Sequence, residues 1–148
     1  MPPRAIKLGH AVLKVRSLAA SVPFYRDVLG LKEVASYRGS MVFFSCGDNH
    51  HDLALLEVGA EAADSPEHGI GLYHLAFKVG DSLNELRAFR DHLQKMGIPL
   101  AGQSDHRVSQ SLYLNDPDGM LVECYVDADP ALWKNDPAAV AYIGPLNL

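Results

Sequence analysis

The sequence repeats itself once, and this repeat limits the available folds more than any other feature. The segment His10–Val15 (HAVLKV) aligns with His74–Val79 (HLAFKV) at an offset of 64 residues, and the two share His, Lys and Val. At the same offset, the pair Arg26-Asp27 aligns with the pair Arg90-Asp91. A repeat of this kind indicates two copies of one supersecondary unit that pack together. We therefore predict two equivalent halves, each beginning with a strand headed by a histidine.

Each histidine-headed run is short and apolar, and a segment with helical spacing follows it. In the second half, Asp81 or Ser82 can cap a helix, apolar residues then recur at three- and four-residue intervals, and Gly97 ends it. In the first half Pro23 lacks a backbone donor. The prediction there is a turn followed by a helix that starts near Ser21.

Strand-like runs follow both helices. They cover residues 34–37, 41–46 and 53–58 in the first half, and the vicinity of residue 100, 111–114 and 120–126 in the second. The turn signals Gly47-Asp48-Asn49 and Asp116-Pro117-Asp118-Gly119 join the last two strands of each half into a hairpin. Each half therefore reads βαβββ. The predicted fold class is α+β, with two βαβββ modules forming a half-open mixed β-barrel around one metal site.

We predict a single domain over residues 1–148. Its parts are module one (about 5–58), a linker (59–71), module two (about 72–127) and a C-terminal tail (128–148). A chain of this length with 48% hydrophobic residues can bury about two thirds of its unfolded surface. The tail is expected to wrap the domain, with Trp133 as its anchor.

Composition excludes several classes of partner. The net charge is −5 and no basic stripe is present, which argues against nucleic acid. The first eight residues lack the apolar core of a signal peptide, and no apolar run is long enough to span a bilayer. We expect a cytoplasmic protein without membrane contact. Cys46 and Cys124 both lie in apolar strand-like runs, where a cysteine packs as a small hydrophobe.

Three residues in these strands suggest a metal site. A histidine at the head of an apolar strand needs a polar partner, and the repeat brings His10 and His74 to equivalent places. Glu123 is the one charged residue in the late strand 120–126. Two imidazoles and one carboxylate with open positions form the facial triad that non-haem Fe(II) oxygenases use. We predict that His10, His74 and Glu123 bind a divalent metal ion.

At this point the chain resembles a known family, the vicinal oxygen chelate superfamily, which includes glyoxalase I, antibiotic-resistance proteins and type I extradiol dioxygenases. The resemblance runs from Leu8 to about Asp129, and its signatures are Phe24–Gly30 (FYRDVLG) and Asp116–Gly119 (DPDG). The finer match is to single-domain extradiol catechol dioxygenases. It implies an enzyme of aromatic compound breakdown that uses Fe(II), or Mn(II) or another divalent metal, with O₂ and a catecholic substrate.

The resemblance also implies site residues. The family's metal ligands fall on the three positions named above. Its acid/base histidine falls on His51, its conserved tyrosine on Tyr113, ten residues before the ligand glutamate, and a further histidine on His106. An imidazole with an ordinary pKa near 6.5 can take a proton from a catechol and return it later. Tyr113 and His106 can hydrogen-bond to the substrate or to dioxygen.

Three alternatives stay open at the level of sequence. A glyoxalase I-like isomerase would need a fourth ligand in the first half. Aligning Phe44 with Tyr113 places Ala54 opposite Glu123, and Glu57 lies three residues further on. A metal-dependent thiol transferase uses three ligands but gives no reason for His51 and Tyr113. A metal-free, drug-sequestering module would make the histidines incidental. Superfamily members can exchange halves between subunits, so we expect a homodimer.

Overall fold

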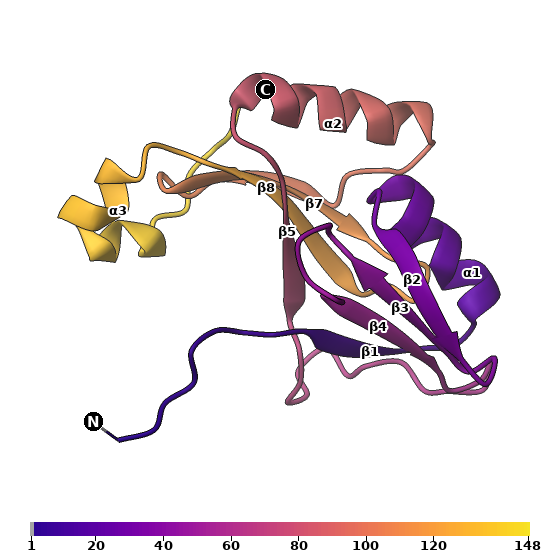
Figure 1. Ribbon diagram of the computed structural model, residues 1–148. Helices are drawn as coiled ribbons and strands as arrows, with labels where there is room; N and C mark the ends of the chain where they lie inside the picture. Colours follow the sequence, from indigo (N-terminus) through magenta and orange to yellow (C-terminus); the bar gives the residue numbers. More distant parts are fainter. Residues whose placement is uncertain (1) are drawn as a thin grey trace. The chain divides into compact units, whose positions relative to one another are not determined.

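The computed structural model describes residues 2–148 and divides the chain into two compact units, Met1–Ser65 and Pro66–Leu148. Unit 1 contains β1 (Ala11–Val15), α1 (Leu18–Pro23), the π-helical turn η1 (Phe24–Val28), β2 (Lys32–Tyr37), β3 (Met41–Ser45) and β4 (Leu53–Glu57). Unit 2 contains β5 (His74–Gly80), α2 (Leu83–Lys95), β6 (Gly102–Asp105), β7 (Ser109–Asn115), β8 (Leu121–Asp127), α3 (Ala131–Asn135) and the 3₁₀ turn η2 (Pro137–Ala141) (Figure 1).

The two units have the same sheet topology, as the repeat predicts. The strand order is β1-β4-β3-β2 in unit 1 and β5-β8-β7-β6 in unit 2. In each, the first strand pairs in parallel with the last, and the remaining pairs are antiparallel. The predicted α+β class and the βαβββ modules are confirmed. Across residues 2–148 the strand hydrogen bonds form two separate four-stranded sheets, so they do not close a barrel.

The core of unit 1 lies between α1–η1 and one face of its sheet. Alternation along the strands places Leu13, Phe44, Leu53 and Leu55 on this face, each at most 5% exposed. Tyr25 from η1 is fully buried against them, with its ring centroid 6.4 Å from that of Phe44. At the end of β1 the chain is tied to the segment that follows β4.

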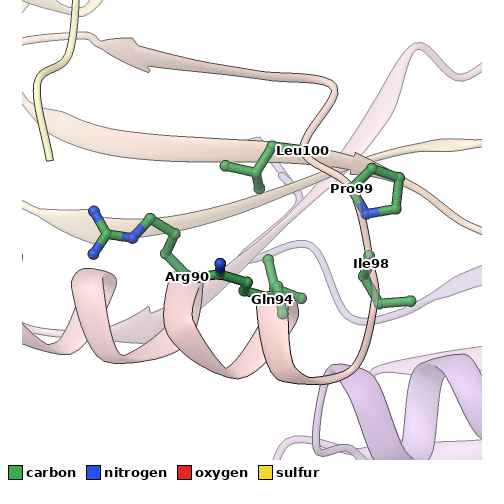
Figure 2. A pocket seen from close by; sticks show the side chains of 6 residues that line it. Arg90, Gln94, Ile98, Pro99 and Leu100 are labelled. Atoms are coloured by element: carbon green, nitrogen blue, oxygen red, sulfur yellow. The ribbon is translucent and has the colours of Figure 1, made fainter.

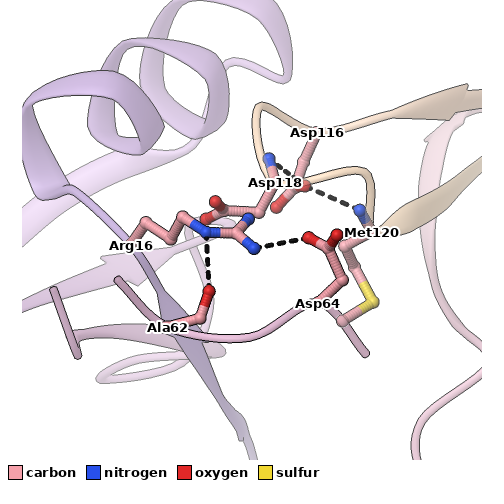
Figure 3. A network of polar contacts seen from close by, with 6 residues as sticks. All are labelled: Arg16, Ala62, Asp64, Asp116, Asp118 and Met120. Carbon is pink, nitrogen blue, oxygen red and sulfur yellow. Dashed lines mark hydrogen bonds and ion pairs between the residues drawn. The ribbon is translucent and has the colours of Figure 1, made fainter. Parts of the chain in front are cut away.

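Arg16 makes this connection between β1 and the segment after β4. Its Nε donates to the Ala62 carbonyl at 3.0 Å, and its guanidinium also pairs with Asp64 (Figure 3). The Arg16 side chain is about one third exposed and that of Asp64 mostly exposed. We therefore assign this contact a positioning role in the loop rather than a large stabilisation.

The first helix begins earlier than predicted. α1 starts at Leu18 and includes Pro23, whereas the sequence prediction placed a turn there and a helix start near Ser21. Pro23 has φ −59° and ψ −36°, which are helical values, so the ring fits the helix and only its missing donor matters. The helix continues as a π-turn, in which Leu29 N–H donates to the Phe24 carbonyl five residues back.

The helix of unit 2 follows the prediction closely. Ser82 caps α2: its hydroxyl accepts from the backbone N–H of Glu85, whose carboxylate in turn accepts from the Ser82 hydroxyl. α2 lies over one face of the unit 2 sheet (Figure 1). Leu86 and Leu93 on α2 are buried, as are Val122 and Cys124 on β8. The other face of this sheet carries the candidate site.

The two cysteines differ, and one prediction about them is wrong. Both are free. Cys124 packs in the core, where burial raises the pKa of its thiol to about 12. Cys46 is exposed just after β3, and its backbone N–H donates to the Asp52 carboxylate, so it does not pack as a core hydrophobe.

The tail also differs from the prediction. Trp133 is 48% exposed and is not the anchor. Leu146 is buried instead, and Gly144 forms an isolated bridge with Asp105 at the end of β6. Backbone hydrogen bonds and the burial of Ala139 and Leu146 thus hold the tail in unit 2. Over residues 2–148 the structure contains no helix that is long and apolar enough to cross a membrane.

Candidate metal and substrate site

A polar cluster lies on the face of the unit 2 sheet that is opposite α2. His74 Nε2 is 2.9 Å from Glu123 Oε2, and the other carboxylate oxygen, Oε1, accepts from the Ser111 hydroxyl at 2.5 Å. Ser111 is fully buried and Glu123 is 9% exposed. Each carboxylate oxygen of Glu123 therefore faces a defined partner on a neighbouring strand.

Strand register explains why these residues meet. Glu123 on β8 pairs with Tyr113 on β7, and with Ala76 on β5. Because side chains two apart in a strand share a face, His74 and Ser111 project from the same face as Glu123. The sequence separations are long, but the sheet makes these residues neighbours.

The donor atoms of this pair suit a divalent ion. Two ligands at right angles around an ion with bonds of about 2.1 Å lie about 3.0 Å apart. The separation between His74 Nε2 and Glu123 Oε2 is 2.9 Å. His74 Nδ1 is buried and has no hydrogen-bond partner among the described residues. Among residues 2–148 there is no group of three or more His, Cys, Asp or Glu side chains placed to hold a metal ion, so His74 and Glu123 stand as a pair of candidate ligands.

Tyr113 and His106 form a second polar pair in unit 2. The Tyr113 hydroxyl lies 2.8 Å from His106 Nε2, and the Tyr113 ring meets the His74 ring edge-on with centroids 6.0 Å apart. Burial, and then the negative charge of Glu123, raises the pKa of Tyr113. The phenol therefore stays protonated at neutral pH beside the candidate ligands.

In unit 1, three histidines gather where β1 begins. The ring centroid of His51 is 4.3 Å from that of His10 and 4.6 Å from that of His50. The Nδ1 atoms of His50 and His51 lie 2.6 Å apart, so one of them donates to the other. Phe43 on β3 contacts the His51 ring edge-on at 5.5 Å.

The environment of His51 favours its neutral form. Partial burial, followed by the neighbouring His10 and His50, lowers the pKa of His51, against an opposite effect of Asp52. A neutral imidazole is able to accept a proton at neutral pH. His50 is exposed.

The register of unit 1 identifies the counterparts of the unit 2 site. Val12 pairs with Ala54 as Ala76 pairs with Glu123, so Ala54 occupies the position equivalent to Glu123. Ala54 pairs with Phe43 on β3, so the residue equivalent to Tyr113 is Phe43 and not Phe44, with which the sequence alignment matched it. Ala54 is fully buried and has no donor atom.

Glu57, the carboxylate of β4, is engaged elsewhere. Its Oε2 accepts from the backbone N–H of Leu18 at 2.7 Å, which satisfies a free donor at the start of α1. Val15, not a histidine, is its neighbour across the sheet. Unit 1 therefore offers no carboxylate at the place where a fourth metal ligand would lie.

We compared the sequence with known protein families, and the family that matches agrees with the duplicated βαβββ topology. Residues 7–124 match the Glyoxalase/Bleomycin resistance protein/Dioxygenase superfamily. The chain belongs to this superfamily. The predicted resemblance to vicinal oxygen chelate proteins is thereby confirmed.

Relatives in the superfamily include enzymes of two kinds. Catechol-2,3-dioxygenase of Bacillus subtilis is 35% identical over 130 residues, covering 87% of this chain and 44% of that protein. An iron-dependent extradiol dioxygenase of Rhodococcus jostii is 31% identical, covering 78% and 41%. The chain thus spans less than half the length of these two relatives. The crystal structure of lactoylglutathione lyase from Agrobacterium tumefaciens has a TM-score of 0.64 at 30% identity, covering 90% and 98%.

Sequence reasoning missed two contributors to the site of this superfamily member. Ser111, which holds Glu123, lies two residues before Tyr113, and strand alternation alone indicates that it shares the same face. Tyr142 contributes through its backbone carbonyl, 3.0 Å from His106 Nδ1. A backbone contact leaves no pattern in the side chains, so no sequence signal marks it.

A pocket of about 310 Å³ lies elsewhere in unit 2. It is lined by the end of α2 and the loop after it, with Arg90 and Gln94 on the helix and Ile98, Pro99 and Leu100 on the loop (Figure 2). Arg90 donates to the Asp91 carboxylate at 2.9 Å. None of the candidate catalytic or ligand residues lines this pocket.

Proposed function

We propose that the chain is an Fe(II)-dependent extradiol ring-cleaving dioxygenase that acts on a catecholic aromatic compound. His10, His74 and Glu123 would hold the ion, with Mn(II) or another divalent metal as the alternative. The observation that carries this proposal is Ala54, which stands at the position equivalent to Glu123 and cannot ligate a metal. Three ligands leave coordination positions open for a chelating substrate and for O₂.

The donor set fits the ion, and the roles of the other residues follow from their contacts. When bound, Fe(II) would supply a Lewis acid with open positions for the catechol oxygens and O₂. A ring nitrogen of His51 would accept a proton from the catechol, because the pKa of His51 is lowered and its ring is neutral. The Tyr113 hydroxyl, held by His106, would orient the substrate by a hydrogen bond. Ser111 would hold the Glu123 carboxylate in place.

The isomerase alternative has less support. A glyoxalase I-like site uses a fourth protein ligand, and the two carboxylates that flank Ala54 are engaged elsewhere: Glu57 caps α1 and Asp52 accepts from the backbone N–H of Cys46. A thiol transferase or a metal-free binding module gives no role to a neutral His51 beside His10, or to the pair formed by Tyr113 and His106.

The decisive experiment loads the purified protein with Fe(II) under anaerobic conditions and then adds O₂ with a panel of catechols. We expect stoichiometric iron, O₂ uptake and a yellow ring-opened product. His74→Ala should lose the iron, whereas His68→Ala, which changes an exposed histidine of the linker, should keep it. Retention of the iron by His74→Ala, or cleavage of none of the catechols, would refute the proposal and favour an isomerase or transferase.

A further inference from the structure

The C-terminal segment Tyr142–Leu146 is bonded to the strand that leads into His106. Asp105, the last residue of β6, donates its backbone N–H to the Gly144 carbonyl at 3.0 Å and accepts from the Gly144 N–H at 2.8 Å. The side-chain amide of Gln103 donates to the Leu146 carbonyl at 2.6 Å. The segment thus extends the edge of the unit 2 sheet directly beside the candidate site.

The position of Tyr142 is set by contacts on both sides of its backbone. The Arg107 guanidinium lies over the Tyr142 ring, 4.2 Å from its centroid. Gly144 leaves room for this ring, because a Cβ at residue 144 would lie 2.3 Å from the Tyr142 hydroxyl oxygen. The carbonyl of Tyr142 is then 3.0 Å from His106 Nδ1.

The directions of the hydrogen bonds follow from the chemistry of these groups. A carbonyl oxygen only accepts, so His106 Nδ1 must carry a proton and donate it to Tyr142. In the neutral imidazole, Nε2 is then an acceptor. The Tyr113 hydroxyl, 2.8 Å from Nε2, must therefore donate to His106. The Tyr113 hydroxyl also lies within hydrogen-bonding reach of Ser111 and Glu123, so one of its two lone pairs remains for a hydrogen bond from a ligand.

We propose that the segment Tyr142–Leu146 is a positioning element of the site. It fixes His106 with its proton on Nδ1, and His106 in turn makes Tyr113 an acceptor toward the ligand. The site therefore recognises a ligand that presents an O–H donor at this place. This assignment rests on the proposed function, in which the donor is the catechol hydroxyl that keeps its proton.

The direct test is the tautomer of His106 in the full-length, metal-free protein. Two-bond proton–nitrogen correlation spectra of ¹⁵N-labelled protein at neutral pH distinguish a protonated Nδ1 from a protonated Nε2. The His106 signals are assigned by their loss in His106→Asn. We expect the proton on Nδ1. A proton on Nε2, or an even mixture of the two forms, overturns the inference whatever the activity.

The second test disrupts the backbone bridge between Gly144 and Asp105. Gly144→Pro deletes the N–H that donates to Asp105, and its Cβ also displaces the Tyr142 ring, so the variant disrupts both contacts that place the Tyr142 carbonyl. Val140→Ala, at an exposed position in η2, is the control. We expect Gly144→Pro to give a mixture of His106 tautomers and to lower kcat for ring cleavage about tenfold at unchanged iron content, as for the loss of one hydrogen bond. Val140→Ala should match the parent in both readouts. A pure Nδ1-protonated His106 in a folded Gly144→Pro variant contradicts the inference.

The two proposals fail separately. The nitrogen spectra need neither iron nor a catechol, so they test the tail alone. A protonated Nδ1 in a protein that cleaves no catechol supports the positioning role of the tail and refutes the dioxygenase.

Discussion

The two halves of the chain use the same strand pairs for different chemistry. In unit 1, the central positions of β3 and β4 carry Phe43 and Ala54. In unit 2, the equivalent positions on β7 and β8 carry Tyr113 and Glu123. The backbone register is repeated, yet one pair is apolar and the other has a carboxylate and a phenol. The repeat thus supplies positions, and the side chains at two of them decide which half provides the carboxylate.

The largest expected effect comes from making unit 2 resemble unit 1 at the ligand position. Glu123→Ala should abolish stoichiometric iron binding and slow ring cleavage by about 10³-fold, because a bound metal contributes several kcal/mol. The measurements are metal analysis and O₂ uptake. Glu57→Ala is the control: it should cost about 1 kcal/mol of stability through the lost contact with Leu18 and leave iron content unchanged. Iron loss in both variants would argue that Ala54 is not the deciding difference.

His51 tests what unit 1 contributes in place of a carboxylate. His51→Ala should keep its iron and slow ring cleavage by roughly 10²-fold, as expected for the loss of an acid/base group. Single-turnover kinetics in the iron-loaded protein measure this effect. Full activity in the variant would remove His51 from the mechanism.

Ser111 sharpens the comparison within unit 2. Ser111→Ala removes the hydrogen bond to Glu123 Oε1 and should weaken iron affinity by roughly 10- to 100-fold, as for other groups that hold a metal ligand. Competition with a coloured chelator measures the affinity. Ser109→Ala, on the same strand, should bind iron like the parent. Equal affinities in the two variants would mean that Glu123 needs no support from Ser111.

Tyr113→Phe removes the hydroxyl and gives β7 the same side chain that β3 carries at the equivalent position, Phe43. We expect an approximately tenfold fall in kcat with iron content unchanged, because one hydrogen bond is lost while the ring and its packing remain. Steady-state kinetics with the best catechol of the panel provide the value. A loss of iron instead would show that the phenol supports the metal ligands rather than the substrate.

The smallest effect concerns the hairpin that presents His51. The backbone N–H of Cys46 lowers the pKa of Asp52 below its ordinary value. A carboxylate with a lowered pKa stabilises the fold above its unfolded pKa of about 3.9, and this contribution disappears as the pH falls through the folded value. Urea unfolding should therefore show a shallower acid decline below about pH 4 in Asp52→Asn, with a difference of about 1 kcal/mol or less at neutral pH. Parallel pH profiles would contradict this role.

Periodicity and repetition made most of the fold predictable. Strand alternation and the helical spacing of 83–95 reflect burial of one face, which the sequence records directly. The start of α1 was not predictable from the presence of Pro23 alone, because a proline with helical φ stops a helix only where its donor is needed. The alignment of Phe44 with Tyr113 was wrong by one residue, because Phe43 occupies the equivalent position. Phe43 and Ala54 lie eleven positions apart, but Tyr113 and Glu123 lie ten apart, so the two hairpins differ in length.

The site itself was predictable in part. Side chains with distinctive chemistry on repeated strands, such as His74 and Glu123, were marked by their positions, and the structure brings these two together. Ser111 has no distinctive chemistry of its own, and it matters only through the carboxylate opposite. Trp133 was a natural candidate for an anchor because of its size, but hydrogen bonds at Gly144 hold the tail instead.

The contact between the Tyr142 carbonyl and His106 has a consequence for how this protein can change. Since the contributing atom belongs to the main chain, almost any residue can stand at position 142 without removing it. The path and length of the chain between β8 and Gly144 are what must be preserved. Insertions or deletions in residues 128–141 are therefore the changes that would uncouple the tail from the site, and alignments that score only residue identity would overlook them.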